Sequence, residues 1–230
     1  MKPYSQGCLM TPLFIGDIHG RPKLVLKAIK LAQKKNARLI FLGDLLDGDA
    51  NSTPEDSAEC VRLIRENGCE CVLGNHELYP IFARNKSELV RWWKSQDADT
   101  SDRIWAEWQA ILHYLSPEDL DWLKRLPLYI QGKNWIAVHA QVPLNRYLLP
   151  FNKIKGTPTP SQILITDGTN KIPFWATKYD GRFGHCYFGH TRRSKLKNQF
   201  LFPHATLLDW GAKKGGTAGA CFLNDEPFPL

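Results

Sequence analysis

The sequence contains no apolar run that approaches the ~20 residues needed to cross a membrane as a helix. Its opening stretch, MKPYSQGCLMTPLF, also lacks the long apolar segment of a secretory signal peptide. Six cysteines are spread over 230 residues, which is much sparser than the framework of a disulfide-stabilised domain. We therefore expect reduced thiols, a cytoplasmic location and no membrane partner.

Repeats, low-complexity segments and clear linkers are also absent, so one domain spanning residues 1–230 is the simplest organisation. Apolar residues make up 43% of the chain and charged residues 23%, as in ordinary globular proteins. The net charge is +7 and the pI is about 9.1. Such a charge fits an anionic partner (phosphate, nucleotide or nucleic acid) or simply a solvated basic surface. It does not by itself indicate a nucleic-acid partner.

Apolar patterning predicts an α/β fold. Short apolar runs predict strands and helical apolar spacing predicts helices, in the order strand 13–15, helix 22–35, strand 38–42, helix 54–66 and strand 69–73. Two strand–helix–strand units in series predict parallel strands. Further strands are expected within 128–138 and at 186–188, 205–208 and 219–223, and a long loop at 141–172.

Residues 78–125 differ from the rest and carry five of the eight tryptophans. The segment looks helical throughout, and Ser116 followed by Pro117 is typical of a helix start. We interpret the tryptophans as packing residues of a helical insertion, with a ligand-stacking role as the alternative.

Polar residues follow five of the predicted strands. The segments are GDIHG (16–20), GDLLDGD (43–49), GNHE (74–77), VHA (138–140) and GHT (189–191). Ligands of open α/β sheets bind at the carboxyl ends of the strands, so we expect these side chains at one edge of the sheet. Gly-Asp and Gly-Asn alone would be turns, but turns do not explain four histidines at strand ends. His113, His185 and His204 follow no such pattern and are interpreted as structural or surface residues.

Mixed carboxylate and imidazole ligands suit Mn, Fe or Zn better than Ca or Mg. A pair of ions needs a bridging carboxylate, and Asp44 is central in the series. Two ions ~3.5–4 Å apart clamp the attacking and leaving oxygens of an in-line displacement, and a water between them ionises near neutral pH to give the attacking hydroxide. This chemistry is that of phosphoester hydrolysis.

As a set, these motifs resemble those of the calcineurin-like metallophosphoesterases, from Phe14 to about Leu223. GNHE, VHA and GHT are most similar to the branch that holds bacterial Ser/Thr phosphoprotein phosphatases and symmetrical diadenosine tetraphosphate hydrolases. The resemblance implies a four-layer fold, a double β-sandwich with helices on both outer faces, in which residues 78–125 form a helical cap beside the cleft.

The resemblance also implies roles for individual residues. The implied metal ligands are Asp17 and His19 for the first ion, Asp44 as the bridge, and Asn75, His139 and His190 for the second. His76 would be the general acid that protonates the leaving oxygen, and Asp47 would orient its imidazole.

Two positions depart from the family pattern. Gly48 stands where the family usually has an arginine that clamps phosphate, and Gln141 stands where it usually has glycine. The candidate replacements for the clamp are Arg21, Arg146, Arg182 and Arg192. Arg182 and Arg192 are preferred because they flank Gly189-His190, the segment that follows the predicted strand 186–188.

Three functions remain open. The first is a cytoplasmic two-metal phosphatase acting on phosphomonoesters, such as a phosphoprotein or a small phosphoester, with Mn as the preferred metal and Fe or Zn as alternatives. The second is a hydrolase of dinucleoside polyphosphates, such as diadenosine tetraphosphate, or of RNA 5′ phosphates. The third is a binding protein with a degenerate site, which only Gly48 and Gln141 support.

Overall fold

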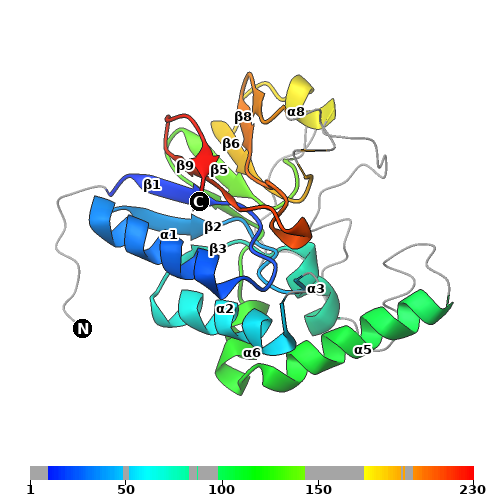
Figure 1. Cartoon of the computed structure of the whole chain (residues 1–230). Helices are drawn as coiled ribbons and strands as arrows, with labels where there is room; N and C mark the ends of the chain where they lie inside the picture. The colour runs from blue at the N-terminus through cyan, green and yellow to red at the C-terminus, as the bar shows by residue number, and fades with distance from the viewer. Residues whose placement is uncertain are drawn as a thin grey trace.

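The computed structural model describes residues 10–48, 52–82, 87, 98–142, 174–192, 194 and 199–230. Two mixed sheets of five strands pack face to face, with helices outside them (Figure 1). The first sheet has the spatial order β10 (Phe228–Pro229), β9 (Gly219–Phe222), β1 (Pro12–Ile15), β2 (Arg38–Phe41) and β3 (Glu70–Cys71). β1, β2 and β3 are parallel, as predicted, and β9 runs antiparallel to β1.

The second sheet has the order β4 (Tyr129–Gln131), β5 (Trp135–Val138), β6 (His185–Phe188), β8 (Ala205–Leu207) and β7 (Leu201–Phe202). β5, β6 and β8 are parallel, and the two edge strands are antiparallel to their neighbours. The predicted strands are present, although β3 is shorter than expected. The two-residue strands β7 and β10 were not predicted, because two residues show no periodicity.

Aromatic side chains fill the space between the sheets. The Phe14 ring stacks on Tyr187 with 3.9 Å between centroids and meets the edge of Trp135 at 5.0 Å. All three side chains are buried. Aromatic pairs in this geometry contribute about 0.5–1.5 kcal/mol beyond the area they bury, so they help to fix the sheets relative to each other.

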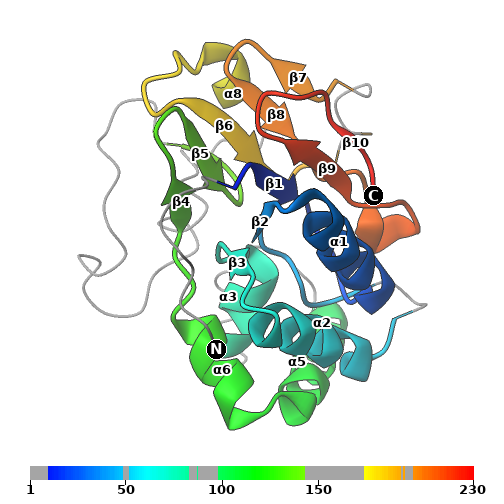
Figure 2. The ribbon, with the colours of Figure 1, turned by 90° about the vertical axis from the view of Figure 1, so that its left-hand side faces the viewer.

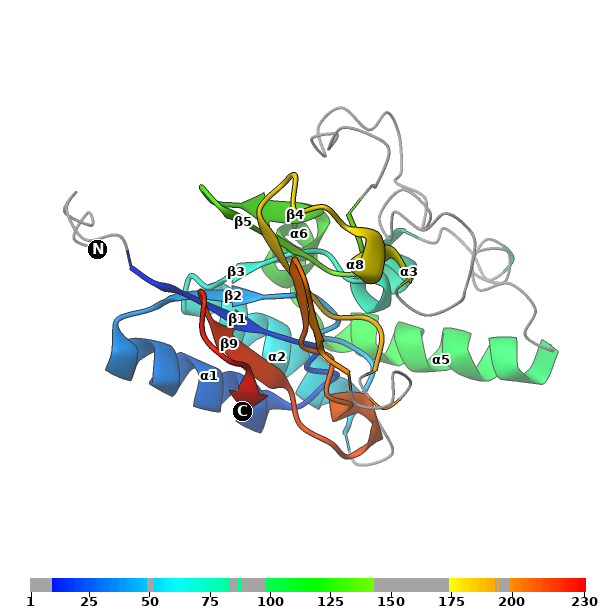
Figure 3. The ribbon, with the colours of Figure 1, turned by 90° about the horizontal axis from the view of Figure 1, so that it is seen from above.

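Helices α1 (Pro22–Lys35) and α2 (Pro54–Glu66) cover the outer face of the first sheet (Figure 3). Both keep their predicted bounds because their end signals are local. Each has proline in its first turn, and Thr53 forms a capping box with Asp56 at the start of α2. α1 ends where Asn36 adopts a left-handed conformation at φ 48°.

The insertion contains α3 (Asn75–Phe82), α5 (Ala98–Tyr114) and α6 (Pro117–Lys124), and α2 lies between α1 and these last two helices (Figure 2). The Trp108 side chain is fully buried in the core that α1 and α2 share, and Trp105 and Trp122 pack against the same core. The packing interpretation is therefore confirmed for these three, whereas Trp92 and Trp93 lie outside the described residues.

The outer face of the second sheet carries α8 (Phe174–Lys178), whose Ala176 is buried in the same apolar cluster as Ile136 and Phe188. A 3₁₀ turn, η3 (Ala212–Lys214), follows β8. The long loop predicted at 141–172 lies outside the described residues after Val142. No described helix is both long and apolar enough to span a membrane. The five described cysteines are free.

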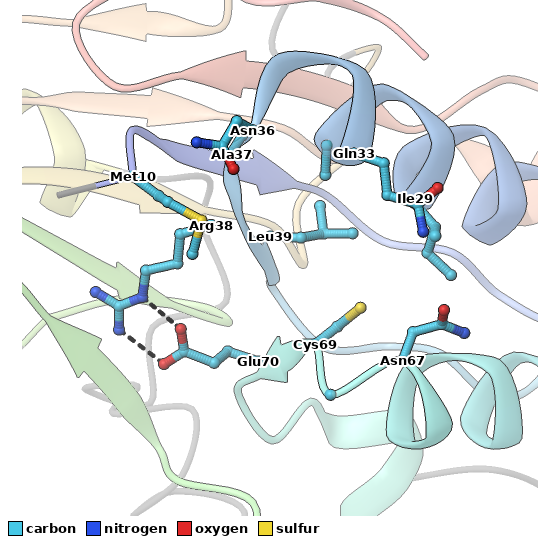
Figure 4. A pocket seen from close by; sticks show the side chains of 12 residues that line it. Met10, Ile29, Gln33, Asn36, Ala37, Arg38, Leu39, Asn67, Cys69 and Glu70 are labelled. Carbon is cyan, nitrogen blue, oxygen red and sulfur yellow. Dashed lines mark hydrogen bonds and ion pairs between the residues drawn. The ribbon is translucent and has the colours of Figure 1, made fainter. Parts of the chain in front are cut away.

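A pocket of about 420 Å³ lies at the amino ends of β2 and β3 (Figure 4). Arg38 and Glu70 face each other there in a two-pronged ion pair, with 2.7 Å between Nη2 and Oε1. The Cys69 thiol also lines the pocket, and burial raises its pKa to about 11. This pocket lies at the opposite end of the strands from the polar motifs.

Candidate active site

The five polar motifs meet at one end of the sandwich, but they come from two sheets. Three follow β1, β2 and β3, and two follow β5 and β6. The expectation of a single sheet edge was therefore wrong, because the chain enters the second sheet after the helical insertion. The two sheets join where the His190 N–H, after β6, reaches both carboxylate oxygens of Asp17, after β1, at 3.1–3.2 Å. Within the second sheet, the Gly189 N–H donates to the His139 carbonyl at 2.8 Å.

Asp44 is the centre of the cluster. Its Oδ2 lies 3.7 Å from His19 Nε2 and 3.8 Å from His76 Nε2, and its Oδ1 lies 3.3 Å from His139 Nε2. Two groups of potential metal ligands share this carboxylate, one with His19 and His76 and one with His139 and His190. In each group the ligand atoms lie within 4.8 Å of one another. A shared central carboxylate is what a bridging role for Asp44 requires.

His19 is held as a neutral imidazole. Its Nδ1 lies 3.2 Å from the Leu46 carbonyl oxygen and 3.0 Å from that of Asp47, so Nδ1 carries the proton and Nε2 faces the cluster. Burial and the neighbouring His76 lower the pKa of His19 to about 3. Backbone carbonyls that fix the tautomer in this way are typical of histidines that bind metals.

His139 and His190 converge on Asn75. His139 Nε2 and His190 Nδ1 lie 2.9 Å and 2.8 Å from Asn75 Oδ1. The second ring nitrogen of His139 lies 2.8 Å from the Leu42 carbonyl. Burial lowers the pKa of His139, but the charge of Asp44 and its hydrogen bond outweigh burial and raise the pKa to about 10.

His76 and Asp47 form a close pair beside the cluster. His76 Nδ1 lies 2.7 Å from Asp47 Oδ2, and the Lys213 ammonium lies 2.6 Å from the same oxygen. Burial raises the pKa of Asp47, but the two partners outweigh it and hold the pKa below its usual range. Lys213 was not predicted, since 166 residues separate it from Asp47 and no motif links them.

Glu77, the last residue of the GNHE motif, is a further functional residue for which the sequence predicts no role. Its side chain is fully buried, and its carboxylate accepts four backbone N–H groups, from Leu45 (2.7 Å), Leu46 (3.1 Å), Asp44 (2.8 Å) and Gly74 (3.0 Å). Burial and the Asp44 charge raise the pKa of Glu77, whereas the hydrogen bond from the Leu46 N–H and the nearby His139 and His76 lower it. Glu77 therefore fixes the two loops that present Asp44 and Asn75. A carboxylate directly after a strand-end motif was the available signal.

The loops of the cluster hold unusual backbone conformations. Left-handed φ values occur at His19 (49°), Asp44 (53°), Asp47 (61°) and His190 (65°). Only two other described residues that are not glycine have positive φ. Such conformations cost about 1–3 kcal/mol each and concentrate at functional sites, where the fold must aim side chains at a common point.

The charges of the cluster favour a bound cation. Asp17, Asp44 and Asp209 are all buried, and Asp209 was also missed by sequence reasoning. Burial and the charges of Asp209 and Asp44 raise the pKa of Asp17 well above its usual value. Burial likewise raises the pKa of Asp209 to about 6. Carboxylates crowded in this way, with imidazole and amide groups between them, form a donor set that suits a divalent metal ion.

The structure does not bring all the predicted arginines to the cluster. Arg182 lies at the amino end of β6, is 45% exposed and pairs with Asp180 at 2.7 Å. Arg192 is half-buried two residues after His190, and its charge lowers the pKa of Asp209. Arg21 donates to the carbonyls of Ala212 in η3 and of Gly216, two residues after η3 ends. Arg146 lies outside the described residues.

The sequence is similar to a known protein family and to two named relatives. Residues 10–217 match the family model "Calcineurin-like phosphoesterase". The chain is 27% identical to serine/threonine-protein phosphatase 1 of Salmonella typhimurium over 88% of this chain and 87% of that protein. It is 32% identical to a symmetrical bis(5′-nucleosyl)-tetraphosphatase of Pseudomonas fluorescens over 58% of this chain and 44% of that protein.

Two solved structures share the fold. One, a candidate diadenosine tetraphosphatase, superposes with a TM-score of 0.61 at 21% identity and covers 96% of this chain and 93% of that one. A metallophosphoesterase from Sphaerobacter thermophilus superposes with a TM-score of 0.52 at 17% identity, covering 92% of this chain and 83% of that one. With the family match over most of its length and the cluster centred on Asp44, the chain belongs to the calcineurin-like phosphoesterases, a family of metal-dependent hydrolases.

Proposed function

We propose that this protein is a two-metal phosphatase whose first candidate substrates are phosphomonoesters, as in a phosphoprotein or a small phosphoester. The observation that carries the proposal is the pair of ligand groups that share Asp44, beside a hydrogen-bonded His76–Asp47 pair. The Salmonella relative, which aligns over most of both chains, supports the phosphatase assignment.

The proposed ligands are those expected from the sequence. Asp17 and His19 would hold the first ion, Asn75, His139 and His190 would hold the second, and Asp44 would be shared by both. When bound, the two ions supply Lewis-acid charge for the phosphoryl oxygens and activate the water that attacks phosphorus. Mn is our preferred metal, with Fe or Zn as alternatives, since the donor set mixes oxygen and nitrogen. We place the reaction in the cytoplasm and treat residues 1–230 as one domain.

His76 is the proposed general acid, with a proton on each ring nitrogen before the reaction. Nδ1–H donates to Asp47, which fixes the ring and stabilises the imidazolium, while Nε2 faces Asp44 and the cluster. As the bond from phosphorus to the leaving oxygen breaks, the Nε2 proton passes to that oxygen. His76 also belongs to one of the two candidate ligand groups, so its role must be separated from metal binding by experiment.

A second candidate is hydrolysis of dinucleoside polyphosphates or of RNA 5′ phosphates. The observation that favours it is a cavity next to Asp47 that is lined by Lys213 and Lys214, while Arg103 in its wall is paired with Glu107. The Pseudomonas relative is named for such an activity, although it aligns with only part of this chain.

Product analysis tests these functions. Mn-loaded protein would be offered a phosphoserine peptide, a phosphotyrosine peptide and diadenosine tetraphosphate, with His76→Asn as the control. Phosphate release from the peptides, lost in the variant, would establish the phosphatase. ADP from the dinucleotide with slow peptide turnover would establish the second function. Failure to hydrolyse any of the three with metal bound would contradict both.

A further inference from the structure

One ammonium group reaches the catalytic cluster. Within the described parts of the chain, Lys213 is the only lysine or arginine within ion-pair distance of a carboxylate of the cluster. It shares Asp47 Oδ2 with His76 Nδ1, at 2.6 Å and 2.7 Å respectively. Asp47 would keep its bond to His76 if the lysine moved. The Lys213 ammonium can therefore turn to an anionic ligand without leaving a buried carboxylate unpaired.

The turn that carries Lys213 is fixed in place. It is flanked by Gly211 and Gly215, whose φ values of 87° and 77° are in the left-handed region that glycine adopts at little cost. The guanidinium of Arg21 donates to two carbonyls of this segment, those of Ala212 (3.2 Å) and Gly216. Binding by Lys213 therefore requires little ordering of the backbone.

A basic side chain does not fit at position 48 in this loop conformation. A Cβ on Gly48 would lie 1.5 Å from the Ser52 hydroxyl oxygen and 2.8 Å from the His19 carbonyl oxygen, so the loop has no room for a side chain there. The positive charge on this side of the cluster is instead supplied by Lys213, from a distant part of the chain.

A cavity of about 520 Å³ opens next to Asp47 and Lys213, between the start of α2 and α5. Arg103 and Glu107 in its wall neutralise each other at 2.7 Å, whereas Lys214 has no ion-pair partner among the described residues. The buried Ser57 hydroxyl also lines the cavity and has no hydrogen-bond partner in the described part of the chain. Excess positive charge and an unused hydroxyl suit an anionic oxygen ligand.

We propose that Lys213 and this cavity form the leaving-group site, and that it favours leaving groups with negative charge near the scissile bond, such as a nucleoside phosphate. This inference rests on the proposed function, because the leaving group must depart on the side of the acid His76, next to which Asp47 and the cavity lie. Water adds to phosphorus, the bond to the leaving oxygen breaks, and His76 supplies the proton. Lys213 transfers no proton and stabilises the charge that remains on the leaving group.

The test compares two leaving groups in wild type and variants. Diadenosine tetraphosphate releases the anion ADP, and a phosphoserine peptide with uncharged flanking residues releases a neutral alcohol. Lys213→Met should raise KM for the dinucleotide about 10- to 100-fold, the effect of one charge-assisted hydrogen bond. KM for the peptide should stay within about twofold. Lys213→Arg should recover most of the dinucleotide activity, and Lys133→Ala, on an exposed turn of the second sheet, should change neither substrate.

Binding of ADP to the Mn-loaded protein, measured by calorimetry, gives a readout that needs no turnover. Lys213→Met should weaken it by the same factor, and Lys213→Gln serves as a second neutral variant if the methionine variant unfolds. Equal losses for both substrates, or a fall in kcat with ADP binding intact, would overturn the proposal and make Lys213 a residue that positions Asp47. If the wild type hydrolyses neither substrate, the proposed function fails. In that case the comparison of ADP binding between wild type and Lys213→Met alone shows whether Lys213 binds the anion.

Discussion

The two ends of the first sheet differ in how their charged side chains are paired and how deeply they are buried. At the amino ends, Arg38 and Glu70 face each other across β2 and β3, with side chains 37% and 39% exposed. At the carboxyl ends, Asp17 and Asp44 are buried among histidines, on loops with left-handed residues. Charges that neutralise each other in contact with water cost the fold little. Buried like charges cost the fold free energy, so they indicate a site where a cation and a substrate restore the balance.

Of all substitutions at the two ends of the sheet, the replacement of His76 at the carboxyl end should lower kcat the most. We expect His76→Asn to lower kcat by ~10²–10⁴ while both metal ions stay bound, because a general acid is lost but a ligand is not. The loss should shrink for a substrate whose leaving group needs no proton, such as p-nitrophenyl phosphate. Metal content and kcat for the two kinds of substrate would be measured together. Loss of metal in the variant would show that His76 is a ligand, contrary to our assignment.

Glu77 should be the strongest structural support of the carboxyl end. Glu77→Gln turns an amide NH₂ toward backbone N–H donors, so we expect the free energy of unfolding to fall by about 3 kcal/mol. Because the loops of Asp44 and Asn75 lose their anchor, metal affinity should fall about 10- to 100-fold. Urea unfolding and metal titration would measure both, with the exposed Glu226→Gln as the matched control. Unchanged metal affinity would mean that the loops hold their positions without Glu77.

Metal binding at the carboxyl end should release a proton. In the metal-free protein the pKa of His139 is raised to about 10, so its ring is charged at neutral pH. A metal ion needs the neutral imidazole, and it must displace the proton on Nε2. Mn affinity should therefore rise with pH, by up to about tenfold per pH unit below that pKa. Calorimetry at pH 7.5 in two buffers of different ionisation enthalpy would count the proton, and identical heats in both buffers would contradict this account.

The smallest effects should come from the amino end. Removing the Arg38–Glu70 pair by Arg38→Ala and Glu70→Ala should change the free energy of unfolding by about 1 kcal/mol or less, because the pair is partly exposed. The kinetic constants should not change, since the pair lies at the far end of the strands from the cluster. Urea unfolding and steady-state kinetics of the double variant would show both. A clear fall in kcat would mean that the pocket in Figure 4 takes part in function.

How much the sequence could predict follows from the range of the interactions involved. The bounds of α1 and α2 were predictable because proline, the Thr53 cap and Asn36 act within a turn of the helix. The strand-end motifs were likewise local, and the structure brings all eight predicted metal and acid residues together. The division of the strands between two sheets was not predictable from periodicity, which does not say which strands pair.

The remaining parts of the site depend on contacts between distant segments. Lys213 meets Asp47 across 166 residues, and Asp209 reaches the cluster only because β8 lies beside β6. The preference for Arg182 relied on nearness in sequence to His190, but β6 runs between them and separates their ends. Closeness in sequence across a strand implies distance in space.

The most direct test of the account is a titration of metal-free protein with Mn while phosphate ester hydrolysis is followed, in wild type and in Asp44→Asn. If Asp44 bridges two ions, wild-type activity should rise to a plateau at two ions per chain, and the variant should lose activity and most of its metal. A plateau at one ion, or two ions retained by the Asp44→Asn protein, would contradict a two-metal site centred on Asp44.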